Sequence, residues 1–488
     1  MSLRGILEAM QTNPLVQCLP PRMSDVELYR KLQVNPISPE EVAEIPFALR
    51  QNLVAVYKQI FVPTPSTLKI ASFIQDMLYT GLHHRDPREE RNRVFLYDSA
   101  TEKGRAIDES RWWASYASGA VVEGITGTGK SHVLDAYLRM YPQVIEHGPN
   151  EKAGWRALKQ LVWLKVHMPS DGTRGGFLQG AFLELDKALG TSYSNEYKGH
   201  NWTVEKRLVV FLHLLAVHRC GLLIIEEAQE RNLAINAFGA DFLTFFLRLL
   251  NWGVPTVLVG NPLAFTEMRT FSQDVDRFSE GGWFELHPIL RHDSDVWKNQ
   301  VIPSLWLPTL LDCPDERYRS FSNHPLDQTL EGFVWRRTGG NKRYVVRLRR
   351  AVQMHALRCG IQQVTSELVD LVFRTSELMI PIHARIDAFV RRDAAALAPF
   401  IDIPESTYRK LWADMALEES GGDPMPGAKA KPESPNVGAP QATKAKRKTQ
   451  STSRGGQAAK PLKPAEVRTN EMRANQLGKL RSDAEAAS

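Results

Sequence analysis

Cysteine is scarce in this sequence: the 488 residues contain four, at Cys18, Cys220, Cys313 and Cys359. None of them forms a C-x-x-C pair, which argues against a structural zinc site or a disulfide framework and favours a reducing compartment. No apolar run approaches the roughly 18 residues that span a bilayer, and the first residues lack the apolar segment of a signal peptide. We therefore expect a cytoplasmic protein without membrane contact.

Basic charge is present but unevenly placed. The net charge is +6, and residues 424–465 carry nine Lys or Arg against one Glu, a net charge of +8. The rest of the chain therefore carries −2, so any nucleic-acid binding by the folded part must come from a local patch. The basic segment itself fits either nonspecific attraction to DNA or a solvated linker.

The stretch Gly124–Ser131 carries the strongest motif. It reads G-x-x-x-x-G-K-[ST] and lies between the apolar run Ala120–Val122 and a helical pattern at Val133–Leu138, the order expected around a P-loop. Its glycines allow main-chain N–H groups to turn toward phosphate oxygens, and an ordinary glycine turn is the alternative. Lys130 would reach the β- and γ-phosphates, and Ser131 would bind Mg²⁺. The predicted nucleotide-binding residues here are Gly124, Thr126, Gly127, Thr128, Gly129, Lys130 and Ser131.

A second landmark is the apolar run Leu222–Ile225, which Glu226 and Glu227 follow. Such a run predicts a buried parallel strand, with the acids at the mouth of the sheet beside the P-loop. Glu226 would hold Mg²⁺, directly or through water, and Glu227 would orient and polarise the attacking water. Two solvated acids at the start of a helix are the alternative, which the P-loop upstream disfavours.

A third apolar run, Val254–Gly260, ends at Asn261. The Asn261 amide is suited to contact the γ-phosphate or the attacking water, and a plain turn residue at a strand end is the alternative. Further strand-like runs occur at Gln143–Glu146 and Leu161–Val166, with helical patterns between the runs. This alternation predicts an α/β fold with a doubly wound parallel sheet flanked by helices.

Helical patterns dominate the later part of the chain. Leu330–Arg336 and Tyr344–Leu357 indicate two helices, and Arg343, Arg347 and Arg350 share one helical face. The residues before the core either pack on it or bind a partner, and we favour the partner. The predicted domains are an N-terminal partner-binding extension at 1–63, a core at 64–288, a helical lid with C-terminal helices at 289–415, and a disordered basic tail at 416–488 that ends in a short partner-binding segment of weak helical propensity.

Together, the P-loop, the Glu-Glu strand end, Asn261 and the helical module resemble an AAA+ ATPase with an α/β P-loop core and a small helical lid. Within that class the sequence resembles the TnsC/TniB family of bacterial transposition regulators. The stretches that carry this resemblance are Thr64–Ala71, Val162–Thr173, Leu183–Thr191 and Leu222–Gln229. It extends over roughly residues 60–375.

The resemblance implies a role for each matched position. Lys130 and Ser131 match Walker A, Glu226 and Glu227 match Walker B, Asn261 matches sensor 1, and Arg343 matches sensor 2. An arginine finger is expected after sensor 1, where Arg277 matches best and Arg269 second. The first Walker B acid is usually Asp, and the longer Glu226 would favour Mg²⁺ contact through water and slow hydrolysis.

The resemblance also implies ATP and Mg²⁺ as cofactors and a homo-oligomeric ring or helical filament on duplex DNA. Its expected partners are a target-selector protein of the TniQ/TnsD type, the transposase and the transposase's endonuclease partner. ATP would sit between subunits, with Arg277 supplied in trans, and its hydrolysis would disassemble the oligomer. Lys165 and Arg174 are candidates for contacts with DNA phosphates, and solvated loop charges are the alternative for each. Two other classes fit the motifs without DNA binding: a small-molecule phosphotransferase and a signalling or scaffold NTPase.

Overall fold

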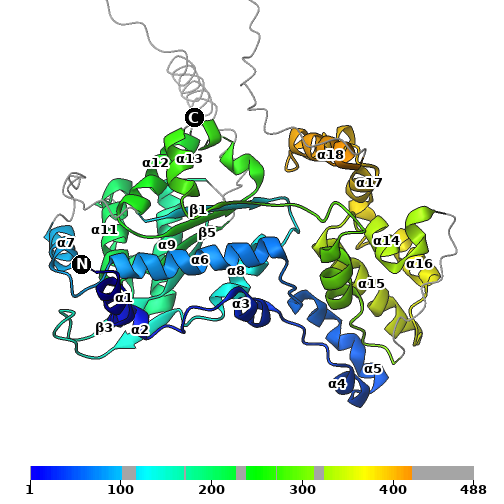
Figure 1. Cartoon of the computed structure of the whole chain (residues 1–488), viewed down its shortest axis with the longest axis horizontal. Coiled ribbons are helices and arrows are strands. Elements are labelled where there is room, and N and C mark those ends of the chain that lie inside the picture. The colour runs from blue at the N-terminus through cyan, green and yellow to red at the C-terminus, as the bar shows by residue number, and fades with distance from the viewer. Residues whose placement is uncertain are drawn as a thin grey trace, which may run out of the picture. The chain divides into compact units, whose positions relative to one another are not determined.

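Five parallel strands form the centre of the protein (Figure 1). The computed structural model describes residues 2–101, 117–169, 172–199, 201–226, 238–266, 268–270, 272–312 and 324–419. Its strands are β1 (Gly119–Gly124), β2 (Val144–His147), β3 (Leu158–Leu161), β4 (Trp163–His167), β5 (Leu222–Glu226), β6 (Thr256–Gly260) and β7 (Trp283–Leu286). The main sheet has the order β4-β5-β6-β1-β7, and every neighbouring pair is parallel. The predicted parallel α/β sheet is confirmed.

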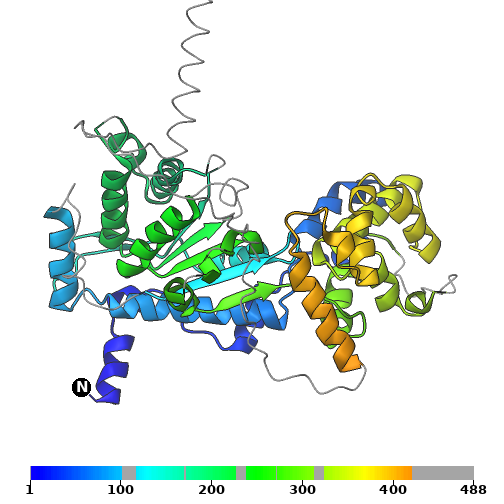
Figure 2. The same cartoon turned by 90° about the horizontal axis from the view of Figure 1, so that it is seen from above.

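Helices cover both faces of this sheet (Figures 1 and 2). Along β5, Leu222 and Ile224 face one side, whereas Leu223 and Ile225 face the other, because side chains alternate along a strand. The first side is covered by α6 (Pro65–His84) and α8 (Lys130–Leu138). The second is covered by α9 (Arg174–Leu189), α11 (Val204–Val217), α12 (Phe238–Asn251) and α13 (Ser272–Ser279). The short α10 (Tyr193–Glu196) follows α9, and α7 (Glu90–Thr101) follows α6.

The first 63 residues pack on both the sheet domain and the lid. They form α1 (Leu3–Gln11), α2 (Pro14–Gln17), α3 (Asp25–Leu32), α4 (Pro39–Glu44), α5 (Phe47–Arg50) and the 3₁₀ helix η1 (Gln51–Gln59). Leu15 and Leu28 are buried in the same cluster as α6, whereas Val54 and Tyr57 are buried with the lid. Packing, the less favoured alternative from the sequence, therefore describes this segment, and a partner for it stays a prediction.

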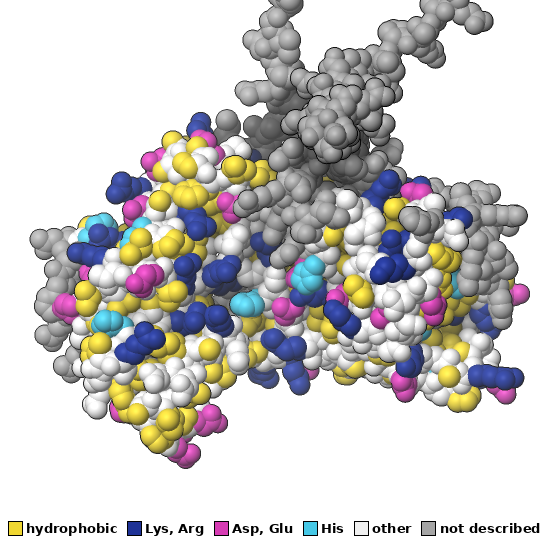
Figure 3. Space-filling view, turned by 180° about the vertical axis from the view of Figure 1, so that it is seen from behind, with side chains coloured by type: hydrophobic (Ala, Val, Ile, Leu, Met, Phe, Trp, Pro, Cys, Tyr) yellow, Lys and Arg dark blue, Asp and Glu magenta, His cyan; other side chains and the backbone are white. Residues whose placement is uncertain are grey.

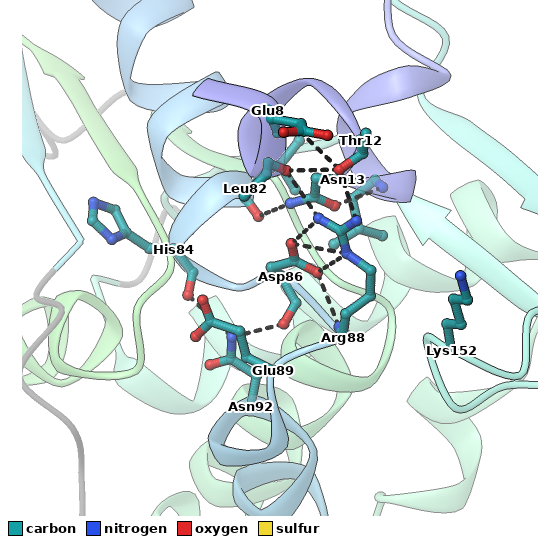
Figure 4. Close-up of polar contacts among 12 residues, drawn as sticks. Glu8, Thr12, Asn13, Leu82, His84, Asp86, Arg88, Glu89, Asn92 and Lys152 are labelled. Carbon is teal, nitrogen blue, oxygen red and sulfur yellow. Dashed lines mark hydrogen bonds and ion pairs between the residues drawn. The ribbon is translucent and has the colours of Figure 1, made fainter. Parts of the chain in front are cut away.

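Arg88 ties the N-terminal helices to the end of α6 (Figure 4). Its guanidinium donates to both carboxylate oxygens of Asp86, at 2.6 to 3.1 Å. The same group donates to the Thr12 hydroxyl at 2.8 Å and to the main-chain oxygen of Ala9 at 2.9 Å. These bonds fix the end of α1 beside the end of α6.

The lid is a helical module with its own core. It contains η5 (Trp297–Trp306, a π-helix), η6 (Pro325–Gln328), α14 (Leu330–Arg336), α15 (Lys342–Cys359) and α16 (Ser366–Thr375). The helix-turn-helix prediction for α14 and α15 is confirmed. Arg337, between these two helices, is buried and pairs with Asp327 at 2.9 Å and with Asp370 through Nε at 2.6 Å. Charges paired in this way fix the turn that leads into α15.

The described chain ends in two further helices, α17 (His383–Arg391) and α18 (Glu405–Glu419). The helix α18 continues to Glu419, three residues past the predicted start of the tail at residue 416, and the domain boundaries stay predictions. Residues 420–488, including the predicted tail segment, lie outside the described residues. The remaining short elements are the 3₁₀ turns η3 (Pro262–Phe265), η4 (Met268–Thr270), η7 (Ile380–Ile382) and η8 (Ala395–Leu397).

One local expectation differs from the structure. The strand predicted at Gln143–Glu146 exists as β2, but it pairs antiparallel with β3 in a separate two-stranded sheet. Within the described part of the chain, no helix has both the length and the apolar character needed to span a bilayer.

Candidate nucleotide-binding site

The P-loop joins β1 to α8 in a conformation that its glycines permit. Gly127 and Gly129 have φ angles of 94° and 105°, in the left-handed region that other residues rarely adopt. Thr128, between them, is buried, and its hydroxyl donates to the main-chain oxygen of Ile125 at 2.9 Å. Thr128 therefore stabilises the loop through its side chain and through its main-chain N–H, which donates to the same Ile125 oxygen at 3.4 Å.

Lys130, the first residue of α8, folds its side chain back over the loop. Its Nζ donates to the main-chain oxygens of Gly124 and Ile125 at 2.6 and 3.2 Å. Burial lowers the pKa of Lys130 to about 8, against the opposing effect of the carboxylates of Glu226 and Asp402. A phosphate in the loop would supply the negative charge that this ammonium lacks in its immediate surroundings.

Glu226 ends β5 and is 3% exposed. Its Oε2 lies 3.0 Å from Lys165 Nζ and 3.7 Å from His167 Nδ1, both on the neighbouring strand β4. Its Oε1 is buried and has no hydrogen-bond partner among the described residues. An unpaired buried carboxylate oxygen is costly, so this atom is suited to a cation or a bound water.

The residues present fit a magnesium ion shared with a nucleotide. Mg²⁺ is usually held by one or two protein ligands and completes its shell with water and phosphate oxygens. Glu226 offers a free buried oxygen, and Ser131 is exposed in the cleft at the start of α8. These are the two ligands that the sequence predicts.

Lys165 lies inside the site, so its prediction as a DNA contact is wrong. Its Nζ bonds Asp135 Oδ1 at 2.6 Å in addition to Glu226, and its side chain is 19% exposed. The register of β4 on β5 brings Lys165 to this position, which the sequence alone does not reveal. Arg174, the second candidate, pairs with Glu205 at 3.3 Å on the surface, where a DNA contact stays a prediction.

Asn261 lies between the P-loop and Glu226. The reason is the strand order, because β6, which Asn261 follows, separates β1 from β5. The Asn261 Oδ1 accepts from the main-chain N–H of Leu263 at 3.2 Å, and its Nδ2 donates to the main-chain oxygen of Asp402 at 2.8 Å. Both ends of the amide are thus fixed at the predicted place, and its sensor role stays a prediction.

The first turn of α15 lies directly on the P-loop. Asn341 caps this helix: its Oδ1 accepts from Arg343 N at 3.0 Å and its Nδ2 donates to the main-chain oxygen of Thr126 at 3.1 Å. Lys342 Nζ lies 3.4 Å from the position that a Cβ on Gly129 would take. Burial lowers the pKa of Lys342 to about 8. Arg343 is exposed at the cleft, as a sensor 2 residue requires, whereas Lys342 is a second lid cation that the sequence analysis missed.

These elements enclose a cleft of about 840 Å³. Its Lys and Arg residues are Lys58, Lys130, Lys342, Arg343, Arg347 and Arg350, and none of the described residues that line it is Asp or Glu. On the face drawn in Figure 3, Lys and Arg side chains gather left of the centre, on the side of the lid. Ile60–Val62 from the N-terminal segment and Leu305 and Val346 from the lid add an apolar wall. The cleft therefore combines an anion-binding end with an apolar surface suited to a base.

Of the two remaining predicted catalytic residues, Glu227 and Arg277, the structure describes only Arg277. Glu227, predicted to orient the attacking water, lies outside the described residues. Arg277 donates to Asn251 Oδ1 at 3.0 Å, and its main-chain oxygen lies close to Gly119 at the start of β1. Because the P-loop follows the end of β1, Arg277 and its own P-loop are at opposite edges of the sheet. A role for Arg277 is therefore confined to a neighbouring subunit and stays a prediction.

Arg269, the second finger candidate, is held by two carboxylates of its own chain. It donates to Glu123 Oε1, and to Glu285 Oε1 at 2.8 Å, and it lies 5.1 Å from the ring centre of Trp283. Burial raises the pKa of Glu123 to about 7, although Arg269 and Trp283 contact it. Arg269 is therefore paired within its own chain, and its role as a finger stays a prediction.

Comparison with known families identifies the class of the core. A family model described as "AAA domain" (AAA_22) matches residues 114–268, which include the P-loop, Glu226 and Asn261. Together with the parallel sheet and its flanking helices, this match shows an AAA+ P-loop NTPase fold. A search of curated proteins found no match to the chain.

Two solved structures with similarity to this chain are of proteins bound to DNA. The Aeropyrum pernix Orc1 protein in complex with DNA is 17% identical with a TM-score of 0.34, and the alignment covers 68% of this chain and 73% of that one. Drosophila ORC bound to DNA is 12% identical with a TM-score of 0.33, and the alignment covers 87% of each chain. At these TM-scores, neither similarity bears on what the present chain binds.

Proposed function

We propose that this protein is an AAA+ ATPase that assembles on duplex DNA when ATP is bound and regulates DNA transposition. One observation carries the nucleotide part: the P-loop and the lid cations Lys342 and Arg343 line one cleft. Glu226, whose Oε1 is unpaired, lies close enough to Lys130 of the P-loop for its carboxylate to oppose the lowering of the Lys130 pKa by burial. The DNA and transposition parts are supported by the resemblance of residues 60–375 to the TnsC/TniB family.

The P-loop residues would bind the triphosphate. Main-chain N–H groups around Gly127 and Gly129 would cradle its oxygens, and Lys130 would exchange its bonds to two carbonyl oxygens for phosphate oxygens. Lys342 and Arg343 would approach the same anion from the lid. Mg²⁺, held by Ser131 and Glu226, would supply neutralisation of the charge that develops on the phosphates.

Hydrolysis would depend on residues at the carboxyl ends of β5 and β6. Glu227 would orient and polarise the attacking water, and Asn261 would direct its amide to the γ-phosphate or to that water. The pair between Lys165 and Glu226 would hold the Glu226 carboxylate in place. Arg277 from the neighbouring subunit would stabilise the transition state, which makes assembly a condition for hydrolysis.

A switch of this kind links nucleotide state to partner choice. ATP between subunits would hold a ring or filament on duplex DNA, and its hydrolysis would release the subunits. The assembled form would accept a TniQ/TnsD-like target selector and recruit the transposase with its endonuclease partner. Contacts with DNA phosphates would be largely independent of sequence, so the selector would choose the target.

Retention on duplex DNA tests the proposal directly. With a nonhydrolysable ATP analogue and Mg²⁺, we expect the full chain to bind duplex DNA with an affinity that falls steeply as salt is added. With ATP in place of the analogue, we expect duplex DNA to stimulate ATP hydrolysis. Lys130→Ala should abolish both activities, and Glu227→Gln should trap the DNA-bound state. ATP hydrolysis by a monomer without any effect of DNA would instead indicate a phosphotransferase or a signalling NTPase.

A further inference from the structure

The helices α17 and α18 form a C-terminal helix pair (His383–Glu419) that packs on the P-loop. Ile125, inside the P-loop, is buried in one cluster with Phe389 of α17 and with Tyr408 and Trp412 of α18. The guanidinium of Arg392 also binds both carboxylate oxygens of Glu419, at 2.9 and 3.0 Å. The pair is therefore one unit, and a residue of the nucleotide-binding loop belongs to its core.

The turn before α18 carries the second contact. This turn, Phe400–Ile403, is closed by a hydrogen bond from Ile403 N to the main-chain oxygen of Phe400 at 2.9 Å. Its Asp402 carbonyl accepts from Asn261 Nδ2 at 2.8 Å. A primary amide has two N–H groups, so the bond to Asp402 fixes the amide plane and leaves a second donor for a ligand.

Little free space separates the turn from the P-loop. The cavity bounded by Ile125, Thr126, Asn341 and Asp402 has about 10 Å³, room for one water at most. Ile403 is 5% exposed in this packing, whereas Ile401 in the same turn is 84% exposed. A displacement of the P-loop or of Asn261 is therefore transmitted to the turn, because close-packed groups have no slack to absorb it.

We propose that the turn Phe400–Ile403 positions Asn261 for ATP hydrolysis, and that the C-terminal helix pair thereby responds to the γ-phosphate. The inference rests on the proposed ATPase function. The Asp402 carbonyl holds one N–H of the amide, and the other N–H meets the γ-phosphate or the attacking water. A change in nucleotide state alters the strain on this shared amide, and α17 and α18 carry it to the end of the described chain.

Two substitutions in the turn test the positioning role. Ile403→Ala removes the packing that holds the turn, and Ile401→Ala is the matched control at an exposed site. We expect Ile403→Ala to lower kcat for ATP hydrolysis by about 10-fold while the ATP Kd changes by less than about 3-fold, because a misplaced group affects the transition state more than binding. Ile401→Ala should match the wild type in both.

Amide hydrogen exchange on the full chain tests the response of the helix pair. In the wild type, a nonhydrolysable ATP analogue should change exchange in residues 383–419 relative to ADP. In Asn261→Ala this nucleotide dependence should disappear, while the analogue still binds. This measurement also decides the question if Ile403→Ala fails to fold.

The two possible failures are distinguishable. A wild-type chain that neither binds nor hydrolyses ATP overturns the proposed function. If the wild-type chain hydrolyses ATP but amide exchange in residues 383–419 is the same with ADP and with the analogue, only the present inference is overturned. Equal kcat values for folded Ile403→Ala and Ile401→Ala would also overturn only the present inference.

Discussion

Asn341 Nδ2 donates a hydrogen bond of 3.1 Å to the main-chain oxygen of Thr126, and so joins the lid helix α15 to the P-loop across 215 positions of sequence. The bond places the next residue, Lys342, over Gly129. Two partly buried lysines, Lys130 and Lys342, then lie at the loop, and burial lowers the pKa of each to about 8. An anion bound between the two lysines would offset the cost of burying their positive charges. Because one lysine belongs to the P-loop helix and the other to the lid, phosphate binding and the position of the lid are coupled.

Lys342→Ala should therefore weaken ATP binding. A hydrogen bond to a charged group is worth about 1.5–3 kcal/mol, which corresponds to a Kd increase of roughly 10- to 100-fold. The effect should be smaller for ADP and absent for AMP, because fewer phosphates reach the lid. Isothermal titration with the three nucleotides measures this gradient.

Lys342→Arg keeps the charge and should retain most of the ATP affinity. Lys410→Ala is the matched control, because Lys410 is an exposed lysine on α18 away from the cleft. An equal loss for all three nucleotides would mean that Lys342 supports the fold of the lid and does not contact phosphate.

Glu226→Gln should uncouple hydrolysis from Mg²⁺. The substitution replaces the buried carboxylate, whose Oε1 is available to a cation, with an uncharged amide. The P-loop and the lid cations remain unchanged. We expect ATP affinity without metal to stay within about 3-fold of the wild type, and the Mg²⁺-dependent rate to fall by roughly two orders of magnitude, since a metal supplies several kcal/mol of charge stabilisation. His167→Gln, 3.7 Å from the same carboxylate and half exposed, should keep near-normal activity.

Glu123 should make stability depend on pH. Burial raises its pKa in the folded protein from 4.5 to about 7, with Arg269, Trp283 and Glu285 as its polar neighbours. The folded state then binds this proton more tightly than the unfolded chain, so the contribution of Glu123 to stability is lost as pH rises through about 7. Hydrogen bonding to His287 lowers the pKa of Glu285 to about 2, so the effect of Glu285 is confined to more acidic pH.

Glu123→Gln removes this titration. The free energy of unfolding of Glu123→Gln relative to the wild type should therefore shift in favour of the variant between about pH 5 and about pH 8. Denaturant unfolding at several pH values measures the difference. Parallel curves for the two proteins across this range would show that Arg269 keeps Glu123 ionised throughout.

The parts of the site that the sequence predicts are those that local patterns encode. A glycine-rich loop must bend where its glycines lie, and buried strands in a parallel sheet bring their carboxyl ends to one edge, so Lys130, Glu226 and Asn261 meet there. The start of α15 is equally local, because Asn341 is a favoured N-cap residue.

The missed parts depend on contacts between distant segments. Ile60–Val62 lines the cleft although it lies in a segment expected to bind a partner, and the Asp402 carbonyl reaches Asn261 across 141 positions. Lys165 resembles a surface charge until the register of β4 on β5 directs it to Glu226. No pattern within a single segment reports these pairings, because each is fixed by tertiary packing.

The place of Arg277 makes a prediction about two chains together. Arg277 is near the start of β1, so it can complete only the site of a neighbouring subunit. Arg277→Ala and Glu227→Gln should each hydrolyse ATP poorly alone. In an equimolar mixture, random assembly gives about a quarter of the interfaces both an intact Glu227 and an intact Arg277, so activity should reappear at about that fraction of the wild type. The same mixture made with Arg269→Ala is the control. If Arg269→Ala is inactive alone and recovers in the mixture, while Arg277→Ala does not recover, the finger role passes to Arg269, which would then have to leave Glu123 and Glu285 on assembly.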